Sequence, residues 1–168
     1  MVKPLIVAVV LVGTFATALA GQVVKYGVTV TAEKDVDFSR FKTYTWVEGQ
    51  PSPLKTVHDQ VVAAVERELK ALGMTKATSG AGDVLVSYHA FSRIDVDVKA
   101  KPDEEGRLPQ TPVGTLAVAL ISPGDDHRRL LVLRAVNPIN TDKAKLEVAI
   151  NQMVAELFAQ YPTRTKKK

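Results

Sequence analysis

The chain has 168 residues, of which 22 are basic and 18 acidic, with no cysteine and a formal net charge of +4. Lys3 and four basic residues among the last five positions supply this excess, so 17 basic and 18 acidic residues leave the body of the chain almost neutral. A nucleic-acid partner requires a clustered basic face, and disulfides and thiolate metal sites require cysteine, so charge and composition argue against all three.

The first twenty residues have the three parts of a secretory signal peptide. A positive start at Lys3 precedes an apolar run, LIVAVVLV, and the small residues Ala18 and Ala20 predict cleavage between Ala20 and Gly21. The alternative is a retained membrane anchor, but the apolar stretch is short for a span and no charged stop follows it. A lipid anchor would require a cysteine at the cleavage point. We therefore expect an exported protein, periplasmic or extracellular, that is soluble and has no transmembrane helix after cleavage.

The domain that follows is expected to span residues 21–162, with residues 163–168 as a basic tail. Its first element is a strand over residues 24–31, where apolar and polar residues alternate. Four of the ten aromatic residues then occur within DFSRFKTYTW, residues 37–46. Asp37 is expected to cap a single helical turn, and the period of two from Lys42 onward predicts a strand. Packing in the core is favoured for these aromatic rings over the alternative, a binding platform for sugar or peptide.

Two helices are predicted from apolar residues at helical spacing. The first begins near Val57, continues to Leu72 and ends at Gly73, a residue suited to the left-handed position after a helix. The second runs from near Thr141 to Pro162, which cannot continue a helix.

Three further strands lie between the helices. The clearest alternation in the chain, from Val84 to Val98, predicts a strand of about fifteen residues, and so long a strand should contain a bulge or bend near Phe91-Ser92. After a charged, Pro-rich loop at 99–112, two apolar runs at 114–122 and 128–136 flank a Pro-Gly-Asp-Asp turn and predict a hairpin. The order of elements predicts an α+β domain: a mainly antiparallel sheet of about five strands with two amphipathic helices packed on it.

Five motifs follow one another along the chain from about Tyr26 to Pro162: DFSRFKTYTWVEG, VHDQVVAAVERELKALG, GDVLVSYHA, PVGTLAVAL and a terminal helix ending in FAQYP. In this order they resemble the bacterial envelope family known as domain of unknown function 4136. The resemblance implies an exported, lipoprotein-like protein with no enzymatic role attached. Two departures stand out. The cysteine of the lipoprotein signal is missing, and the usual Trp-Arg-Gly is here Leu133-Arg134-Ala135.

No catalytic, metal or cofactor site is predicted. None of the three histidines has a partner at a metal-ligand spacing. Ser87 and His89 share one face of the predicted strand with Asp95 and Asp97, but a catalytic triad draws its members from separate elements. No glycine-rich phosphate motif is present either.

Three functional classes remain open. The leading one is a non-catalytic envelope domain that binds a protein or a cell-wall component, through a sheet edge or through a candidate surface formed by Leu85, His89 and Phe91. The second is a small-ligand or lipid carrier, which requires a cavity of several hundred cubic ångströms between helices and sheet. The third and least favoured is a hydrolase, which shifted titratable groups in a cleft would support.

The basic tail offers a further contact. Its charged residues follow Pro162 and are expected to be mobile and solvated, where they either aid solubility or make a weak contact with an anionic surface. These residues are Arg164, Lys166, Lys167 and Lys168.

Overall fold

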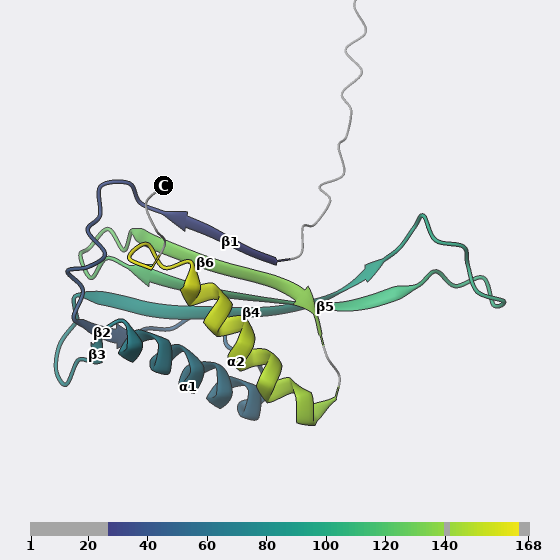
Figure 1. Cartoon of the computed structure of the whole chain (residues 1–168), viewed down its shortest axis with the longest axis horizontal. Coiled ribbons are helices and arrows are strands. Elements are labelled where there is room, and N and C mark those ends of the chain that lie inside the picture. The colour runs from purple at the N-terminus through teal and green to yellow at the C-terminus, as the bar shows by residue number, and fades with distance from the viewer. Residues whose placement is uncertain (1–26, 140–141, 165–168) are drawn as a thin grey trace, which may run out of the picture.

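The structure is a computed structural model that describes residues 27–139 and 142–164. One mixed sheet of six strands carries two helices on one of its faces (Figure 1). In chain order the elements are β1 (Gly27–Ala32), β2 (Thr43–Trp46), α1 (Lys55–Ala71), β3 (Thr75–Lys76), β4 (Val84–Val96), β5 (Gln110–Ile121), β6 (Arg129–Pro138) and α2 (Lys143–Ala159). Residues 1–26, which hold the predicted signal peptide and the start of the first predicted strand, lie outside the described residues.

The α+β class is confirmed, but the sheet differs from the prediction. Its strand order is β1-β6-β5-β4-β2-β3, and β2 pairs in parallel with both β3 and β4. The prediction of about five strands is therefore one strand short. The three long pairings are antiparallel as predicted, but the two short pairings of β2 make the sheet mixed. The sixth strand, β3, has only two residues, too few for a visible alternation. The parallel pairs arise because α1 carries the chain back along the sheet after β2, and such a crossover produces parallel neighbours.

Helix α1 ends where the sequence predicts. Gly73 adopts a φ of +82°, and its N–H donates to the carbonyl of Lys70 at 2.9 Å. The N–H of Met74 donates to the carbonyl of Leu69 at 3.0 Å, and both of these side chains are buried. This is the hydrogen-bond pattern of a Schellman motif, in which glycine takes the left-handed position without steric cost.

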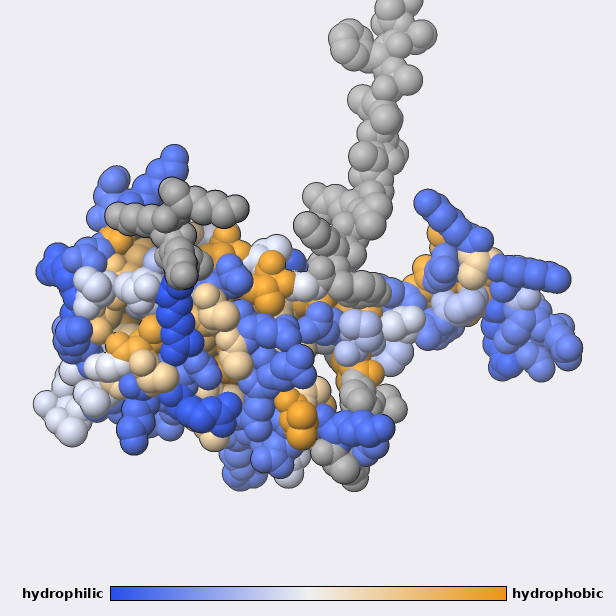
Figure 2. All heavy atoms as spheres, viewed as in Figure 1, coloured by the Kyte–Doolittle hydropathy of each residue, from blue (hydrophilic) through white to orange (hydrophobic). Residues whose placement is uncertain are grey.

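The core lies between the helices and one face of the sheet. Alternate residues of β4 point into it, as predicted, and Val84 and Val86 are fully buried. The other large contributors come from both helices and from β5 and β6: Val61, Val65, Leu69, Leu116, Val118, Leu120, Leu131, Leu133, Val154, Leu157 and Phe158. The outer surface of the helix layer is largely hydrophilic, with scattered hydrophobic residues (Figure 2).

The aromatic cluster packs mainly as the sequence predicts. Phe38 and Tyr44 are buried, and Phe41 and Trp46 are partly buried against the core. The helical turn expected at Asp37 is replaced by a simple turn, closed by the N–H of Arg40 donating to the Asp37 carbonyl at 3.3 Å. The Asp37 carboxylate accepts hydrogen bonds from Ser39, and these bonds lower its pKa below the usual value.

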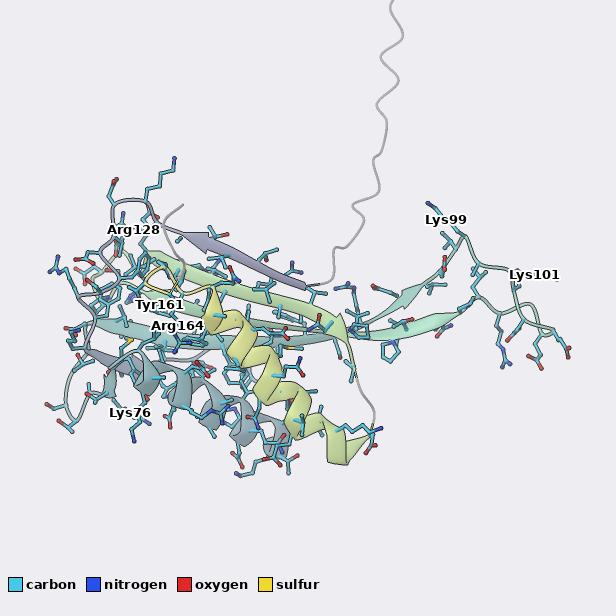
Figure 3. All side chains as sticks on the ribbon, in the orientation of Figure 1. Lys76, Lys99, Lys101, Arg128, Tyr161 and Arg164 are labelled. Carbon is cyan, nitrogen blue, oxygen red and sulfur yellow. The ribbon has the colours of Figure 1, made fainter. Side chains whose placement is uncertain are left out.

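Of the bulge or bend expected in the long strand, no bulge forms. The register of β4 with β5 runs unbroken from the Leu85–Ile121 pair to the Val96–Gln110 pair. Because β5 is almost as long as β4, the extra length continues as a two-stranded arm beyond the body of the sheet (Figure 1). Lys99 and Lys101 lie in the loop at its end (Figure 3).

The first strand is less buried than predicted. β1 is an edge strand that pairs only with β6, and Val30 is 38% exposed although its alternation predicts an inward position. The two helices cover the centre of the sheet rather than this edge (Figure 1).

The tail prediction is wrong for Arg164. Its guanidinium donates to the Glu68 carboxylate at 2.8 Å and lies 3.4 Å from the Phe158 carbonyl, so it connects the end of α2 to α1 (Figure 3). Although the helix ends before Pro162, the chain stays packed on α1 as far as Arg164, because Arg164 pairs with Glu68. Lys166, Lys167 and Lys168 lie outside the described residues. Neither helix in the described part of the chain combines the length and apolar character needed to cross a bilayer.

Candidate binding face

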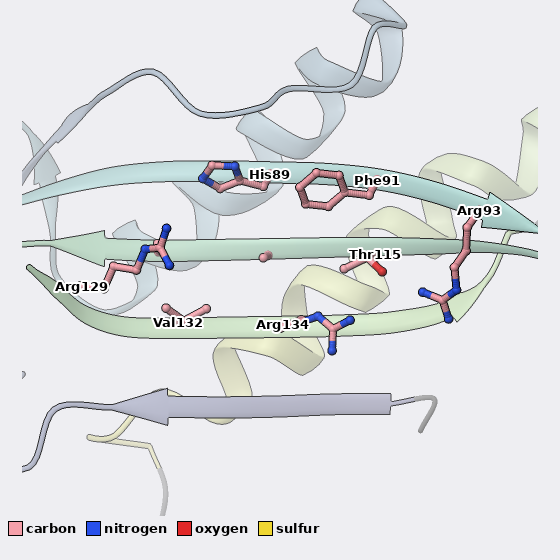
Figure 4. Close-up of a pocket in the computed structure, with 9 residues that line it drawn as sticks. His89, Phe91, Arg93, Thr115, Arg129, Val132 and Arg134 are labelled. Carbon is pink, nitrogen blue, oxygen red and sulfur yellow. The ribbon is translucent and has the colours of Figure 1, made fainter. Parts of the chain in front are cut away.

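The face of β4, β5 and β6 opposite the helices, here called the open face, carries the candidate site. Within the described residues both helices lie on the other side of the sheet (Figure 1). The open face contains a shallow hollow of about 430 Å³, lined only by side chains of these three strands (Figure 4). Its shape follows from the alternation of β strands, which sends every second residue to this side.

One side of the hollow is aromatic. His89 and Phe91 are successive open-face residues of β4, and their rings stack with centroids 6.3 Å apart and planes 12° from parallel. Phe91 is 47% exposed, an unusual exposure for a phenyl ring in a sheet. The pair therefore presents a flat aromatic surface to the hollow (Figure 4).

The other side is cationic. Arg129 and Arg134 project from β6, and Arg93 extends from β4 toward β6 (Figure 4). Arg93 donates to both carboxylate oxygens of Asp95, at 2.6 and 3.2 Å. No carboxylate among the described residues pairs with Arg129 or Arg134, so the hollow keeps two uncompensated positive charges.

The sheet register fixes the spacing of these cations. Arg134 is opposite Ala117, and Arg129 is opposite Ile121. Four residues along β5 separate these positions, which is about 13 Å at the rise of an extended strand. Arg93 is opposite Val113, a further four residues along β5. The three arginines therefore form a row along the strands.

Small residues form the floor between the aromatic and cationic sides. Thr115, Ala117 and Ala119 of β5 line it. Ser87, opposite Ala119 on the same face, is only 1% exposed, and its hydroxyl has no hydrogen-bond partner in the described structure. A buried hydroxyl without a partner is uncommon in folded proteins.

The structure brings together two of the three predicted surface residues. His89 and Phe91 line the hollow. Leu85 does not line it: this residue is buried and pairs across the sheet with Ile121, which in turn pairs with Arg129. The arginines of β6 were missed because residues 128–136 read as an apolar run. An arginine at 134 inside that run was the available signal, but only the register shows that Arg134 lies across Ala117 from His89.

The structure does not assemble a Ser–His–Asp triad from Ser87, His89 and Asp95. Because the Ser87 hydroxyl has no partner, it makes no hydrogen bond to His89, which stacks on Phe91. Asp95 is bonded to Arg93. Among the described residues no group of three or more histidine, aspartate or glutamate side chains could hold a metal ion.

A second cleft, of about 330 Å³, lies where the connector after β2 crosses β4. Nδ1 of His58 and the hydroxyl of Tyr88 are 2.6 Å apart, and the N–H of Ser52 donates to the same hydroxyl at 3.3 Å. Burial raises the pKa of Tyr88 above its usual value. The phenol therefore stays protonated at neutral pH, the opposite of what an activated nucleophile requires.

A third cavity, of about 290 Å³, lies between the sheet and the N-terminal halves of the two helices. Its lining is mainly apolar and includes Leu54, Val57, Leu116, Ile150 and Met153. It is at the small end of the range for ligand pockets.

These features define a class: an α+β domain with one helix-covered face and one open, cationic and aromatic face. The chain belongs to the family described as "Domain of unknown function (DUF4136)", whose model matches residues 28–163. The family resemblance of the sequence is thus confirmed. No curated protein matches the chain significantly.

Two solved structures share the fold. The first is a PDZ domain protein from Parabacteroides distasonis, with 18% identity and a TM-score of 0.58; 83% of this chain aligns, but only 36% of that longer protein. The second is the PelC dodecamer from Paraburkholderia phytofirmans, with 10% identity and a TM-score of 0.54; 84% of this chain aligns with 99% of PelC. At these identities the likeness concerns the fold alone.

Proposed function

We propose that the chain is an exported, non-catalytic envelope domain that binds an anionic partner, a protein or a cell-wall component, on its open face. The observation that carries this proposal is the pair of uncompensated arginines, Arg129 and Arg134, facing the stacked rings of His89 and Phe91 across a hollow. Guanidinium groups bind carboxylates and phosphates through two parallel hydrogen bonds, and aromatic faces add apolar contact.

Absence of catalysis is part of the proposal. Its support is that Ser87 and His89 are not hydrogen-bonded and that the raised pKa of Tyr88 keeps its phenol protonated. Active sites usually depend on groups whose pKa moves toward the working pH.

Photo-crosslinking in cells tests the binding face. A crosslinking amino acid placed at Ala117 reports on the hollow, and the same residue at Val148, which is exposed on α2, serves as the control position. We expect products from Ala117 that disappear when Arg129→Gln and Arg134→Gln are added. Equal products from both positions, or products unaffected by the arginine changes, would contradict the proposal.

Export rests on the three-part leader and has its own test. Intact-mass analysis of the chain from an envelope fraction should give Gly21 as the first residue. Recovery from the cytosol with Met1 retained would contradict it.

The apolar cavity favours a second candidate function, a carrier of a small apolar ligand. Leu116, Ile150 and Met153 would contact the ligand there. Displacement of an environment-sensitive fluorescent fatty acid tests it: binding by the wild type that Ile150→Trp abolishes, without loss of the fold, supports a carrier. The lysines that follow Arg164 support a smaller proposal, a weak contact of Lys166, Lys167 and Lys168 with anionic surfaces.

A further inference from the structure

We infer that the ligand of the open face is an acidic glycan, a sugar chain that carries carboxylates at intervals. This inference rests on the proposed function and names the partner of the same site. It follows from the spacing of the cations, the aromatic side of the hollow and the pairing of the strands beneath it.

The cations are too far apart for one small anion. Arg129 and Arg134 start about 13 Å apart on the sheet. Arg93, next in the row, is already bonded to the Asp95 carboxylate. One carboxylate is saturated by one guanidinium fork. The two uncompensated arginines therefore match a chain with separated negative charges.

The aromatic side fits the ring of a sugar. The rings of His89 and Phe91 are within 12° of parallel and run along the same direction as the arginine row (Figure 4). Aromatic faces carry partial negative charge and attract the polarised C–H groups on the flat side of a pyranose. A sugar lying on Phe91 would have its substituents directed across the small floor residues toward Arg134.

The floor of the hollow offers a peptide little to bind. β5 pairs with both β4 and β6, and β6 pairs with both β5 and β1, so the backbone groups of these two strands are already used. Addition of a peptide strand requires a free edge. Along the hollow, the described residues leave such an edge only on β4 beyond Ala90, at the aromatic side of the hollow and not on its floor. Ala117 and Ala119 also leave no deep pocket for an anchoring side chain. Recognition here must come from side chains. The guanidinium groups suit carboxylates, and the aromatic rings suit flat sugar rings.

Isothermal titration of the chain from Gly21 with three probes tests the inference. The probes are an oligomer of galacturonic acid, its fully methyl-esterified form, which keeps the rings but removes the charges, and an oligoglutamate of similar charge. The binding variant is Arg129→Gln with Arg134→Gln. The control variant, Arg40→Gln with Lys70→Gln, removes the same charge from exposed positions away from the open face.

We expect the acidic oligomer to bind, and its affinity to fall as salt is raised. Methyl esterification and the double arginine change should each weaken binding about tenfold or more, the scale of a lost charge-assisted hydrogen bond. The control variant should stay within about twofold. Phe91→Ala should weaken binding of the oligouronate and leave that of oligoglutamate unchanged.

The outcomes separate the two proposals. Binding of oligoglutamate at least as tight as that of the oligouronate would overturn the glycan assignment and leave the anionic binding face standing. Equal binding of the methyl ester would overturn the role of the carboxylates. Failure of every anionic probe to bind, or equal binding by the double arginine variant, would overturn both.

Discussion

Tyr161 shows how one polar atom is used inside the core. Its side chain is buried at the end of α2, and its hydroxyl donates to the carbonyl of Phe38 at 3.2 Å (Figure 3). This bond joins residues far apart in the sequence, the turn before β2 and the last helix. Burial raises the pKa of the phenol to about 12.

Tyr161→Phe should therefore lower the free energy of unfolding by about 1–2 kcal/mol at pH 7, because it leaves a buried carbonyl without its donor. The folded state also holds the phenolic proton to higher pH than the unfolded chain does. Its contribution is complete below pH 10 and is lost as pH rises from about 10 to 12. Denaturant melts across this range should show a steeper loss for the wild type than for the variant, and equal slopes would contradict this role.

Substitution of two phenylalanines, one in the core and one on the open face, distinguishes a structural ring from a binding ring. Phe38 is buried against Phe41 and Tyr161, so Phe38→Ala should cost about 3–5 kcal/mol of unfolding free energy. Phe91 is half-exposed in the hollow, so Phe91→Ala should change stability by only about 0.5 kcal/mol. Urea unfolding of both variants provides the measurement. A large loss for Phe91→Ala would make that ring structural rather than part of a binding face.

At the scale of elements, the short strand β2 depends on close backbone contact. A Cβ added at Gly82 would lie 2.7 to 2.8 Å from three backbone atoms of Tyr44. The Asp83 carboxylate accepts the N–H groups of Lys42 and Thr43, both at 2.8 Å, and these bonds lower its pKa. The segment before β4 thus holds the start of β2 in register.

Gly82→Ala should consequently destabilise the fold by about 1–3 kcal/mol, the usual cost of overpacking. Gly124→Ala is the matched control, since a Cβ there meets its nearest atom at an ordinary 3.5 Å. Thermal melts should show a clear loss for the first and almost none for the second. Similar melting temperatures for both variants would mean that β2 shifts to make room for the added methyl group, and that close contact at Gly82 is not needed for stability.

Prediction from sequence succeeded where a pattern is long and local. Helix α1 with its Gly73 end and the inward face of β4 follow from periodicity alone. The two-residue β3 has no periodicity to detect, and the parallel pairing of β2 depends on where α1 returns the chain. The unbroken register of β4 was missed because strand length alone does not show that the partner strand is equally long.

At the scale of the whole molecule, the residues of the open face could be predicted only where they are close together in the sequence. His89 and Phe91 share a face two residues apart, so local alternation was enough to predict them. Arg129 and Arg134 join them only through the β4–β5 and β5–β6 registers, which a single sequence does not display. Arg164 likewise finds Glu68 only when α2 packs beside α1.

The most direct test of the central claim, that the open face binds an anionic ligand, is amide shift mapping by NMR during titration of the labelled chain from Gly21 with the oligouronate and the oligoglutamate. We predict that the largest shifts occur on β4, β5 and β6 around His89, Ala117 and Arg134, and disappear in the double arginine variant. Shifts concentrated on α1 and α2, or no saturable shifts with either probe, would contradict the account.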